Sequence, residues 1–384
     1  MRILIVPDSF KGSLSSLEAA QAIHRGLARV WPDGAFRLLP AADGGEGTVE
    51  AVVSASGGTL HRCTVQDPLG RPVEAVFGLL PNGTAVMEMA QASGLPLLSP
   101  GERNPAIAST YGTGQLLLEA LRLGCRRVLL GIGGSATNDG GAGMAAALGV
   151  RFLDQENRLL PPGGLALERL AVLDCTCLDP RLRETEVTAA CDVTNPLCGP
   201  AGASQVYGPQ KGADPALAQR LDAALARYGQ VLEDTFGQDF AALPGAGAAG
   251  GLGAGLMAFC GARLRPGVDV IFDLLRLEDE IAVSDLIFTG EGRADATSAS
   301  GKLLSGIGRL ALRHRKPVIA LAGSLGPGAD ALLAQGITAV LPIADGPMSL
   351  EDSLAQAPQL LAGAAARAAR LLQAGVLLGS GPVL

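Results

Sequence analysis

The sequence RVLLGIGGSATNDGGAGMAAAL, residues 127–148, joins an apolar run to a glycine-rich loop and an alanine-rich segment. Its first part, residues 128–130, is a short apolar run typical of a parallel strand that is buried on both faces. The glycines that follow remove side-chain bulk, so an anion can approach the backbone closely. Asn138 or Asp139 can cap the next helix, whose unpaired N–H groups and dipole attract negative charge. The stretch therefore predicts a phosphate-binding turn between a buried strand and a helix.

The same alternation of strand and helix occurs at both ends of the chain. Residues 2–6 and 36–39 are apolar strand-like runs, and each is followed by a polar loop and a helix-like segment. The alternation returns near residue 284 and continues to the last helix. Because residues 1–60 hold only two strands, too few for a sheet of their own, we expect them to join residues 284–384 in one sheet.

The middle of the chain is predicted to be a separate, inserted domain. Between residues 60 and 90 the pattern changes to short segments separated by Pro-Leu-Gly and Pro-Asn-Gly turns, which indicates antiparallel strands. At 384 residues, the chain also exceeds the size at which one hydrophobic core keeps growing. We therefore expect two domains, residues 1–60 plus 284–384 and the inserted residues 61–283.

The composition favours an α/β protein and excludes several kinds of partner. The chain is 48% hydrophobic but only 3% aromatic, so its cores must be built from Ala, Val, Leu and Ile. Lys and Arg total 30 against 37 Asp and Glu, a net charge of −7, and no basic block is interleaved with aromatic residues. No apolar stretch is long enough for a signal peptide or a membrane span. We expect a soluble, cytoplasmic protein that binds neither nucleic acid nor membranes.

Cysteine and histidine usage argues against disulfides and metal centres. The seven cysteines are scattered and odd in number, so they form neither a disulfide framework nor a paired zinc motif. We expect them to be reduced and mostly buried. None of the three histidines lies in a glycine-rich loop, which makes a histidine-rich metal site improbable.

The opening turn also matches a dinucleotide-binding fingerprint. Gly131, Gly133 and Ala136 fit the spacing G-x-G-x-x-A, and Asp154 follows where the ribose-binding acid belongs. Against this, residues 138–141 (Asn-Asp-Gly-Gly) would put cap residues and helix breakers into the first turns of the expected helix. An NAD-dependent dehydrogenase of a small hydroxy acid stays open as an alternative, and so does a non-enzymatic nucleotide sensor.

Two other enzyme classes, the Walker A nucleotide hydrolases and the serine hydrolases, are excluded because their sequence motifs are absent. The nearest candidate for a Walker A loop, SGKL at residues 300–303, has Ala296 in place of the first glycine and Leu303 in place of the magnesium-binding hydroxyl. The segment AGSLG at residues 322–326 misses the nucleophile elbow of serine hydrolases, and no loop histidine is present to act as the base.

Loops that combine carboxylate, glycine and hydroxyl groups recur along the chain. Phosphoryl transfer needs such a set: a cation and backbone N–H groups on the phosphates, carboxylates for Mg²⁺, and one carboxylate to accept the proton of the attacking hydroxyl. Lys11 lies in the first of these loops, where a merely solvated lysine is poorly placed. The loops are PDSFKGS (7–13), ADGGEGT (42–48), SATNDGG (135–141), CDVTNP (191–196) and TGEGRADATS (289–298).

In this order, the loops resemble those of the type I glycerate kinase family over essentially the whole chain. Seven ordered motifs of this length are highly specific. They are PDSFKGSLS (7–15), ADGGEGT (42–48), STYGTGQL (109–116), GIGGSATNDGGAGM (131–144), CDVTNPLCGPAGASQVYGPQKGA (191–213), GAGAAGGLGAGL (245–256) and TGEGRADATSASGK (289–302).

The resemblance implies ATP- and Mg²⁺-dependent phosphorylation of D-glycerate at the 2-hydroxyl, which yields 2-phosphoglycerate. It also implies a flavodoxin-like parallel sheet domain built from both chain ends, with a second α/β domain of mixed sheet inserted and the active site in the cleft between them. A homodimer stays open. The chain departs from similar proteins at residues 295–298, which are Asp-Ala-Thr-Ser instead of Asp-x-Gln-Thr. Thr297 therefore cannot make a contact that needs the amide, whereas Ser298 keeps a hydroxyl.

On this basis we assign hypothetical roles to the loop residues. Asp192 is the expected base on the glycerate hydroxyl, and Lys11 is expected on the transferring phosphoryl group or the substrate carboxylate. Asp8, Ser9 and Arg293 are expected to bind the substrate. The remaining assignments are Gly133, Gly134, Ser135 and Asn138 on the ATP phosphates, and Asp43 and Asp295 on Mg²⁺, directly or through water.

Overall fold

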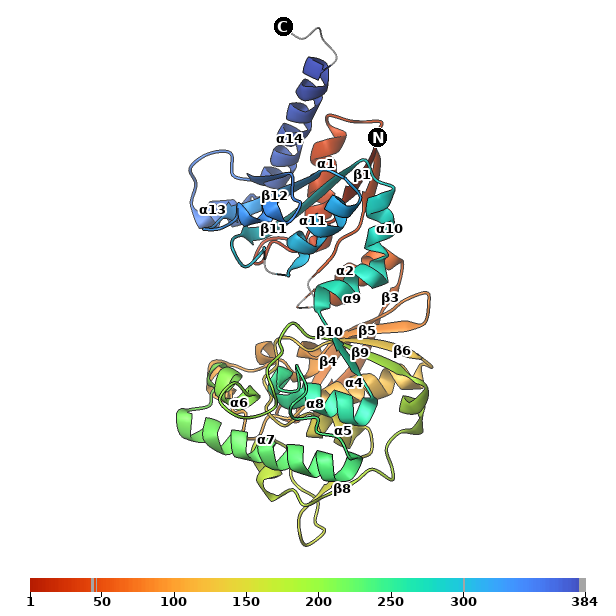
Figure 1. The fold of residues 1–384 in the computed structure, drawn as a ribbon, viewed down its shortest axis with the longest axis vertical. Helices are drawn as coiled ribbons and strands as arrows, with labels where there is room; N and C mark the ends of the chain where they lie inside the picture. Colours follow the sequence, from red (N-terminus) through yellow and green to blue (C-terminus); the bar gives the residue numbers. More distant parts are fainter. Residues whose placement is uncertain (43–44, 46, 300, 380–384) are drawn as a thin grey trace. The chain divides into compact units, whose positions relative to one another are not determined.

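The computed structural model describes residues 1–42, 45, 47–299 and 301–379, which divide into two compact units (Figure 1). The terminal unit consists of residues 1–43, 50–56 and 268–384. The inserted unit consists of residues 44–49 and 57–267. Each unit contains a β-sheet of its own.

A five-stranded, fully parallel sheet forms the centre of the terminal unit. In spatial order its strands are β13 (Ala339–Pro342), β12 (Val318–Leu325), β11 (Leu286–Ala294), β1 (Arg2–Ile5) and β2 (Ala35–Leu38). Counted within the unit, this is the order 2-1-3-4-5 of flavodoxin-like folds. The prediction that both chain ends build one flavodoxin-like sheet is therefore confirmed. The strand order reverses between β1 and β11, and ligands bind at the carboxyl ends of strands beside such a switch point.

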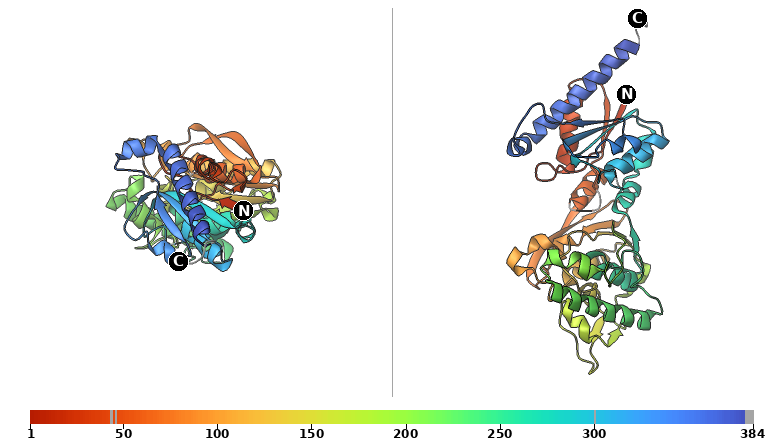
Figure 2. Two further views of the ribbon diagram at one scale, coloured as in Figure 1. Left: turned by 90° about the horizontal axis from the view of Figure 1, so that it is seen from above. Right: turned by 60° about the vertical axis from the view of Figure 1, so that its left-hand side comes forward.

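Helices cover both faces of this sheet (Figure 2). α1 (Ser16–Ala28) and α14 (Ala357–Gly379) pack against each other on one face, where Gly26 permits close contact because a Cβ atom there would overlap the carbonyl group of Ala362. α11 (Leu303–Arg313) lies on the other face. The other helices assigned to this unit, wholly or in part, are α2 (Thr48–Ser56), α9 (Gly267–Leu275), α10 (Leu277–Ala282), α12 (Ala331–Ala334) and α13 (Leu350–Ala355).

A six-stranded mixed sheet forms the centre of the inserted unit. In spatial order its strands are β10 (Arg263–Arg265), β9 (Glu186–Ala190), β6 (Arg127–Gly131), β5 (Thr84–Glu88), β4 (Pro72–Leu79) and β3 (Thr59–Gln66). The first four strands are parallel, whereas β4 is antiparallel to both β5 and β3, as the turn pattern predicted. β7 (Arg151–Leu153) and β8 (Val172–Asp174) form a separate antiparallel pair.

The glycine-rich segment at residues 245–256 packs against the loop that follows β6. It belongs largely to α8 (Ala248–Cys260), which has left-handed backbone angles at residues 249–251. A Cβ atom at Gly250 would overlap the Thr137 carbonyl group, so this glycine is required for packing. The other helices of the inserted unit are α3 (Ala90–Ser93), α4 (Tyr111–Arg122), α5 (Ala142–Ala147), α6 (Ala203–Tyr207) and α7 (Pro215–Phe236).

Two further observations bear on the expectations from composition. Among the described residues, no helix has both the length and the apolar character required to cross a bilayer. All seven cysteines are free thiols, but only Cys125 and Cys260 are buried, and Cys177 is exposed. The expectation that most of them are buried is therefore wrong, because the other four lie half-buried near the surface.

Candidate active site

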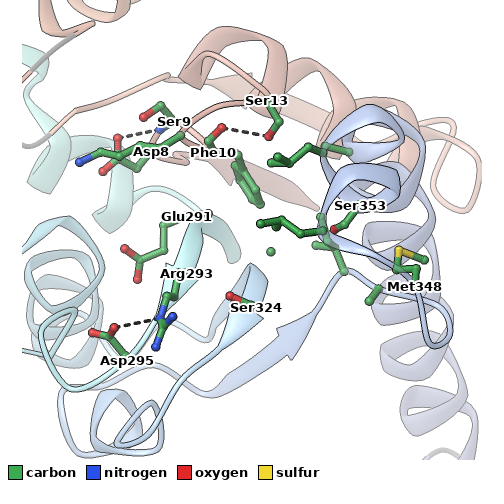
Figure 3. A pocket seen from close by; sticks show the side chains of 18 of the residues that line it. Asp8, Ser9, Phe10, Ser13, Glu291, Arg293, Asp295, Ser324, Met348 and Ser353 are labelled. Atoms are coloured by element: carbon green, nitrogen blue, oxygen red, sulfur yellow. Dashed lines mark hydrogen bonds and ion pairs between the residues drawn. The ribbon is translucent and has the colours of Figure 1, made fainter.

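A pocket in the terminal unit lies at the carboxyl ends of β1 and β11, at the topological switch point (Figure 3). Its volume is about 790 Å³, which is ample for a small organic acid. The walls come from the loop after β1, the ends of β11 and β12, and residues 343–357 around α13. This is the position at which open α/β sheets bind their ligands.

The pocket brings together five of the site residues predicted from the sequence. Asp8, Ser9 and Lys11 come from the loop after β1, and Arg293 and Asp295 come from the end and the following turn of β11. The two segments meet because β1 and β11 are neighbours in the sheet, with Ile5 paired to Phe288. Their individual roles remain predictions.

Local hydrogen bonds hold the two segments in shape. The Asp8 carboxylate accepts a hydrogen bond from the backbone N–H of Ser9 at 2.6 Å. Asp295 Oδ1 accepts from the N–H and the hydroxyl of Thr297 at 2.9 and 2.7 Å, and Oδ2 accepts from Arg293 Nε at 3.2 Å. The hydrogen bond from the Thr297 hydroxyl makes the largest contribution to lowering the pKa of Asp295. Asp295 is therefore ionised at neutral pH.

The pocket also contains three cationic and three acidic side chains. The cations are Lys11, Arg293 and Lys302, and the acids are Asp8, Glu291 and Asp295. Such a mixture suits a small anionic substrate, because the cations can pair with its carboxylate while an acid accepts a proton from its hydroxyl.

Glu291 is a pocket residue that was not assigned a role from the sequence. It lies on β11, and its Oε1 atom is buried without a hydrogen-bond partner among the described residues. Burial raises the pKa of its carboxyl to about 7. The sequence feature that could have indicated a role for Glu291 is its position in the motif TGEGR, where a parallel strand leads into a ligand-binding loop.

Asp43 and Asp295 are the residues predicted to bind Mg²⁺. Asp43 lies outside the described residues. Both carboxylate oxygens of Asp295 already accept hydrogen bonds. Within the described ranges, no cluster of three or more Asp, Glu, His or Cys side chains is arranged to hold a metal ion. The assignment of Mg²⁺ to Asp43 and Asp295 therefore remains a prediction.

Asp192 lies in the inserted unit, just after β9, and is exposed. Its Oδ1 atom accepts a hydrogen bond from the backbone N–H of Gly267 at 2.8 Å. This contact ties the loop after β9 to the segment after β10. Its expected role as the base remains a prediction.

The glycine-rich loop after β6 has an exposed part and a buried part. Gly133 and Gly134 are exposed, whereas Thr137, Asn138 and Asp139 are buried. Ser135 is also buried. A Cβ atom at Gly133 would have no heavy atom within 4 Å, so the backbone of this residue is open to a ligand.

The expected anion site at the start of the next helix is wrong. α5 has only six residues and begins after Gly141. The Asp139 carboxylate accepts hydrogen bonds from the N–H groups of Gly141 and Gly143 at 3.2 and 3.1 Å, and from Thr110 N at 2.8 Å. The side chain of the loop therefore occupies the N–H groups that an anion would use.

Two of the predicted ATP contacts have side chains that bind within the unit. Asn138 Nδ2 donates to Ser204 Oγ at 2.9 Å, and Ser135 Oγ accepts from Lys211 Nζ at 2.8 Å. Lys211 also donates to the Thr137 carbonyl oxygen at 2.7 Å, and burial lowers its pKa to about 7. This buried lysine belongs to the long motif at residues 191–213, but the motif alone did not indicate a role for it.

The dinucleotide fingerprint has no support in the structure. Asp154, its expected ribose ligand, follows β7, which belongs to the separate β7–β8 pair and is not a neighbour of β6. Its carboxylate accepts hydrogen bonds from the N–H groups of Glu156 and Arg158 at 3.0 and 2.9 Å, and from the Arg158 side chain. Asp154 therefore closes a hairpin turn.

Comparisons with known proteins identify the family of the chain. A sequence profile described as the glycerate kinase family matches residues 3–373. A glycerate kinase of Halalkalibacterium halodurans is 48% identical over 364 residues, which are 94% of this chain and 96% of that protein. A glycerate 2-kinase of Escherichia coli K12 is 46% identical, over 89% of this chain and 90% of that protein. A crystal structure of a protein provisionally named glycerate kinase 2, from Salmonella typhimurium LT2, has a TM-score of 0.91 and 47% identity and covers 98% of this chain and 100% of its own.

Proposed function

The chain belongs to the glycerate kinase family, and we propose that it transfers the γ-phosphoryl group of ATP to D-glycerate, giving 2-phosphoglycerate and ADP. The observation that carries the proposal is the pocket at the switch point between β1 and β11, in which three cations and three acids face one cavity. The name glycerate 2-kinase of the Escherichia coli relative favours the 2-hydroxyl as acceptor. The relatives give no support to the dehydrogenase or the sensor.

The substrate is proposed to bind in this pocket. Lys11 and Arg293 pair with the glycerate carboxylate or the transferring phosphoryl group, and Asp8 and Ser9 bind the hydroxyl groups. The side chain of Arg293 is 63% exposed and its ion pair with Asp295 involves only Nε, which leaves its remaining N–H groups for an anion.

The ATP phosphates are proposed to bind at the glycine-rich loop of the inserted unit. The exposed backbone of Gly133 and Gly134 would contact the phosphates. Ser135 and Asn138 stabilise the loop through their hydrogen bonds with Lys211 and Ser204, respectively. Mg²⁺ would arrive with ATP and supply charge neutralisation, with Asp295 binding it through water and Asp43 as the second acid.

A coupled assay of ADP release with D-glycerate tests the proposal. The expected result is ADP formation that depends on glycerate, with phosphorus NMR identifying 2-phosphoglycerate. A change in nicotinamide absorbance without ATP consumption would favour the dehydrogenase, and tight ATP binding without turnover would favour the sensor. If the product were 3-phosphoglycerate, the kinase would stand but the choice of hydroxyl would be wrong.

A further inference from the structure

The acceptor hydroxyl of a kinase substrate must lose its proton during transfer, and the pocket contains an acid suited to accept it. The side chain of Glu291 extends from β11 and lies between the loop that carries Asp8 and the ion pair of Arg293 and Asp295 (Figure 3). Its Oε1 atom is buried and has no hydrogen-bond partner in the described part of the chain. A buried polar atom without a partner costs stability, so an unsatisfied one in a native site calls for a functional explanation.

The charges around Glu291 favour a group that changes protonation near neutral pH. Burial raises its pKa to about 7, and the negative charges of Asp8 and Asp295 act in the same direction. A hydrogen bond with Ser298 and the positive charge of Lys302 act in the opposite direction. The other charged groups that line this pocket are Lys11 and Arg293. A base with this proton affinity is half ionised at pH 7 and takes a proton more readily than an exposed carboxylate does.

We infer that Glu291 is a catalytic residue that accepts the proton of the attacking glycerate hydroxyl. The inference rests on the proposed function. In the step, the O–H bond of glycerate breaks and its proton passes to the Glu291 carboxylate. The hydroxyl oxygen forms a bond to the γ-phosphorus, and the bond between that phosphorus and the bridging oxygen breaks, so that ADP leaves with the electron pair. Glu291 then returns the proton to water.

The other carboxylates are less suited to this task. Asp295 is engaged at both oxygens by Thr297 and Arg293, which stabilise its ionised form and weaken it as a base. Asp192 is exposed and is bound to Gly267 N, and it comes from the inserted unit instead of the loops that form this pocket. Glu291 combines a buried carboxylate oxygen, a raised pKa and a place on the pocket wall.

The test compares Glu291→Gln with the wild-type enzyme in steady-state assays with ATP, Mg²⁺ and D-glycerate. Because a general base contributes about 100-fold or more, kcat should fall at least that far while both KM values stay within a few-fold. The wild-type kcat should rise with pH through an inflection near 7, and this inflection should be absent from the variant. Glu50→Gln removes an exposed glutamate of the same unit as a matched control and should leave kcat unchanged.

Two further variants keep the inference open to refutation. Glu291→Asp retains a carboxylate one methylene further from the substrate and should show an intermediate kcat with the pH inflection preserved, which a merely structural role would not produce. Asp192→Asn should keep the inflection near pH 7. Circular dichroism and calorimetric binding of ATP confirm that each variant is folded.

Three results would overturn the inference. These are a Glu291→Gln enzyme with the wild-type kcat, a loss confined to KM, and a loss that higher Mg²⁺ concentrations reverse, which would make Glu291 a metal ligand. If the wild-type enzyme itself releases no ADP with glycerate, the proposed function fails and the inference fails with it. An active wild-type enzyme with an equally active Glu291→Gln variant rejects the inference alone.

Discussion

Lys211 Nζ donates a hydrogen bond to Ser135 Oγ at 2.8 Å, and this contact joins two loops that are 76 residues apart in the sequence. The same ammonium group binds the Thr137 carbonyl oxygen, and the negative charge of the buried Asp139 favours its protonated form. Buried side chains therefore support one face of the loop that we propose to bind ATP, while Gly133 and Gly134 remain exposed. Such an arrangement pre-organises backbone N–H groups for a phosphate.

Replacement of Lys211 by methionine should change how the stability of the protein depends on pH. The pKa of Lys211 is about 7 in the folded protein against an ordinary value of 10.5. Between these values the unfolded chain binds more protons than the folded one, so the free energy of unfolding rises with pH, by up to about 1.4 kcal/mol per pH unit. Below pH 7 both states bind the proton and the contribution is constant.

Urea unfolding followed by circular dichroism at pH 7, 8 and 9 measures this effect. The difference in unfolding free energy between the wild type and Lys211→Met should increase with pH in favour of the wild type. A difference that stays constant across this range would show that the lysine is not perturbed as described.

Alanine substitution should affect stability differently at two glycines of the same loop. At Gly140, φ is +65° and a Cβ atom would overlap the ring of Tyr228, so Gly140→Ala should destabilise the protein by about 2 kcal/mol or more. At Gly133 a Cβ atom meets nothing within 4 Å, so Gly133→Ala should change stability by less than about 0.5 kcal/mol.

Gly133→Ala should nevertheless weaken ATP binding, because the added methyl group lies on the exposed backbone that we propose to contact the phosphates. We expect the KM for ATP to rise about tenfold, which corresponds to about 1.4 kcal/mol. Thermal unfolding and steady-state kinetics on both variants separate the two effects. An unchanged KM for ATP would remove Gly133 from the proposed phosphate site.

Asp139→Asn should destabilise the inserted unit. The buried carboxylate accepts hydrogen bonds from Thr110 N, Gly141 N and Gly143 N. An amide at this position faces donors with its own NH₂ group, and we expect a loss of about 1–3 kcal/mol. Chemical unfolding provides the measurement, and Asp234→Asn, at an exposed aspartate of α7, provides the control. Equal stabilities of the two variants would contradict the prediction.

Lys11→Met should lower kcat/KM for glycerate without affecting folding. A hydrogen bond from a charged donor contributes about 1.5–3 kcal/mol, so the loss should be about 10- to 100-fold. Lys316→Met is the matched control, because Lys316 precedes β12 at the opposite end of the strand from the pocket and should leave kcat/KM unchanged. A wild-type value for Lys11→Met would place the substrate elsewhere.

Much of the fold follows from local patterns in the sequence. The apolar runs at residues 2–6 and 128–130 are strands because their side chains must be buried on both faces of a parallel sheet. The scarcity of strands in residues 1–60 correctly implied that both chain ends share one sheet. The loop that carries Asp8 and the segment that carries Arg293 could be placed near each other because the strand ends of a parallel sheet meet at one edge.

The class of fold, the family and the loops that carry charged groups could be predicted from the residues alone, because periodicity and motif order do not depend on coordinates. The burial of each of these groups, in contrast, depends on the folded structure. Asp139, one of the two residues expected to cap the helix, occupies with its carboxylate the N–H groups that an anion would use, while Lys211 and Glu291 acquire pKa values near 7. The desolvation of a side chain depends on atoms from segments that are distant in the sequence, so it cannot be predicted from a local pattern of residues.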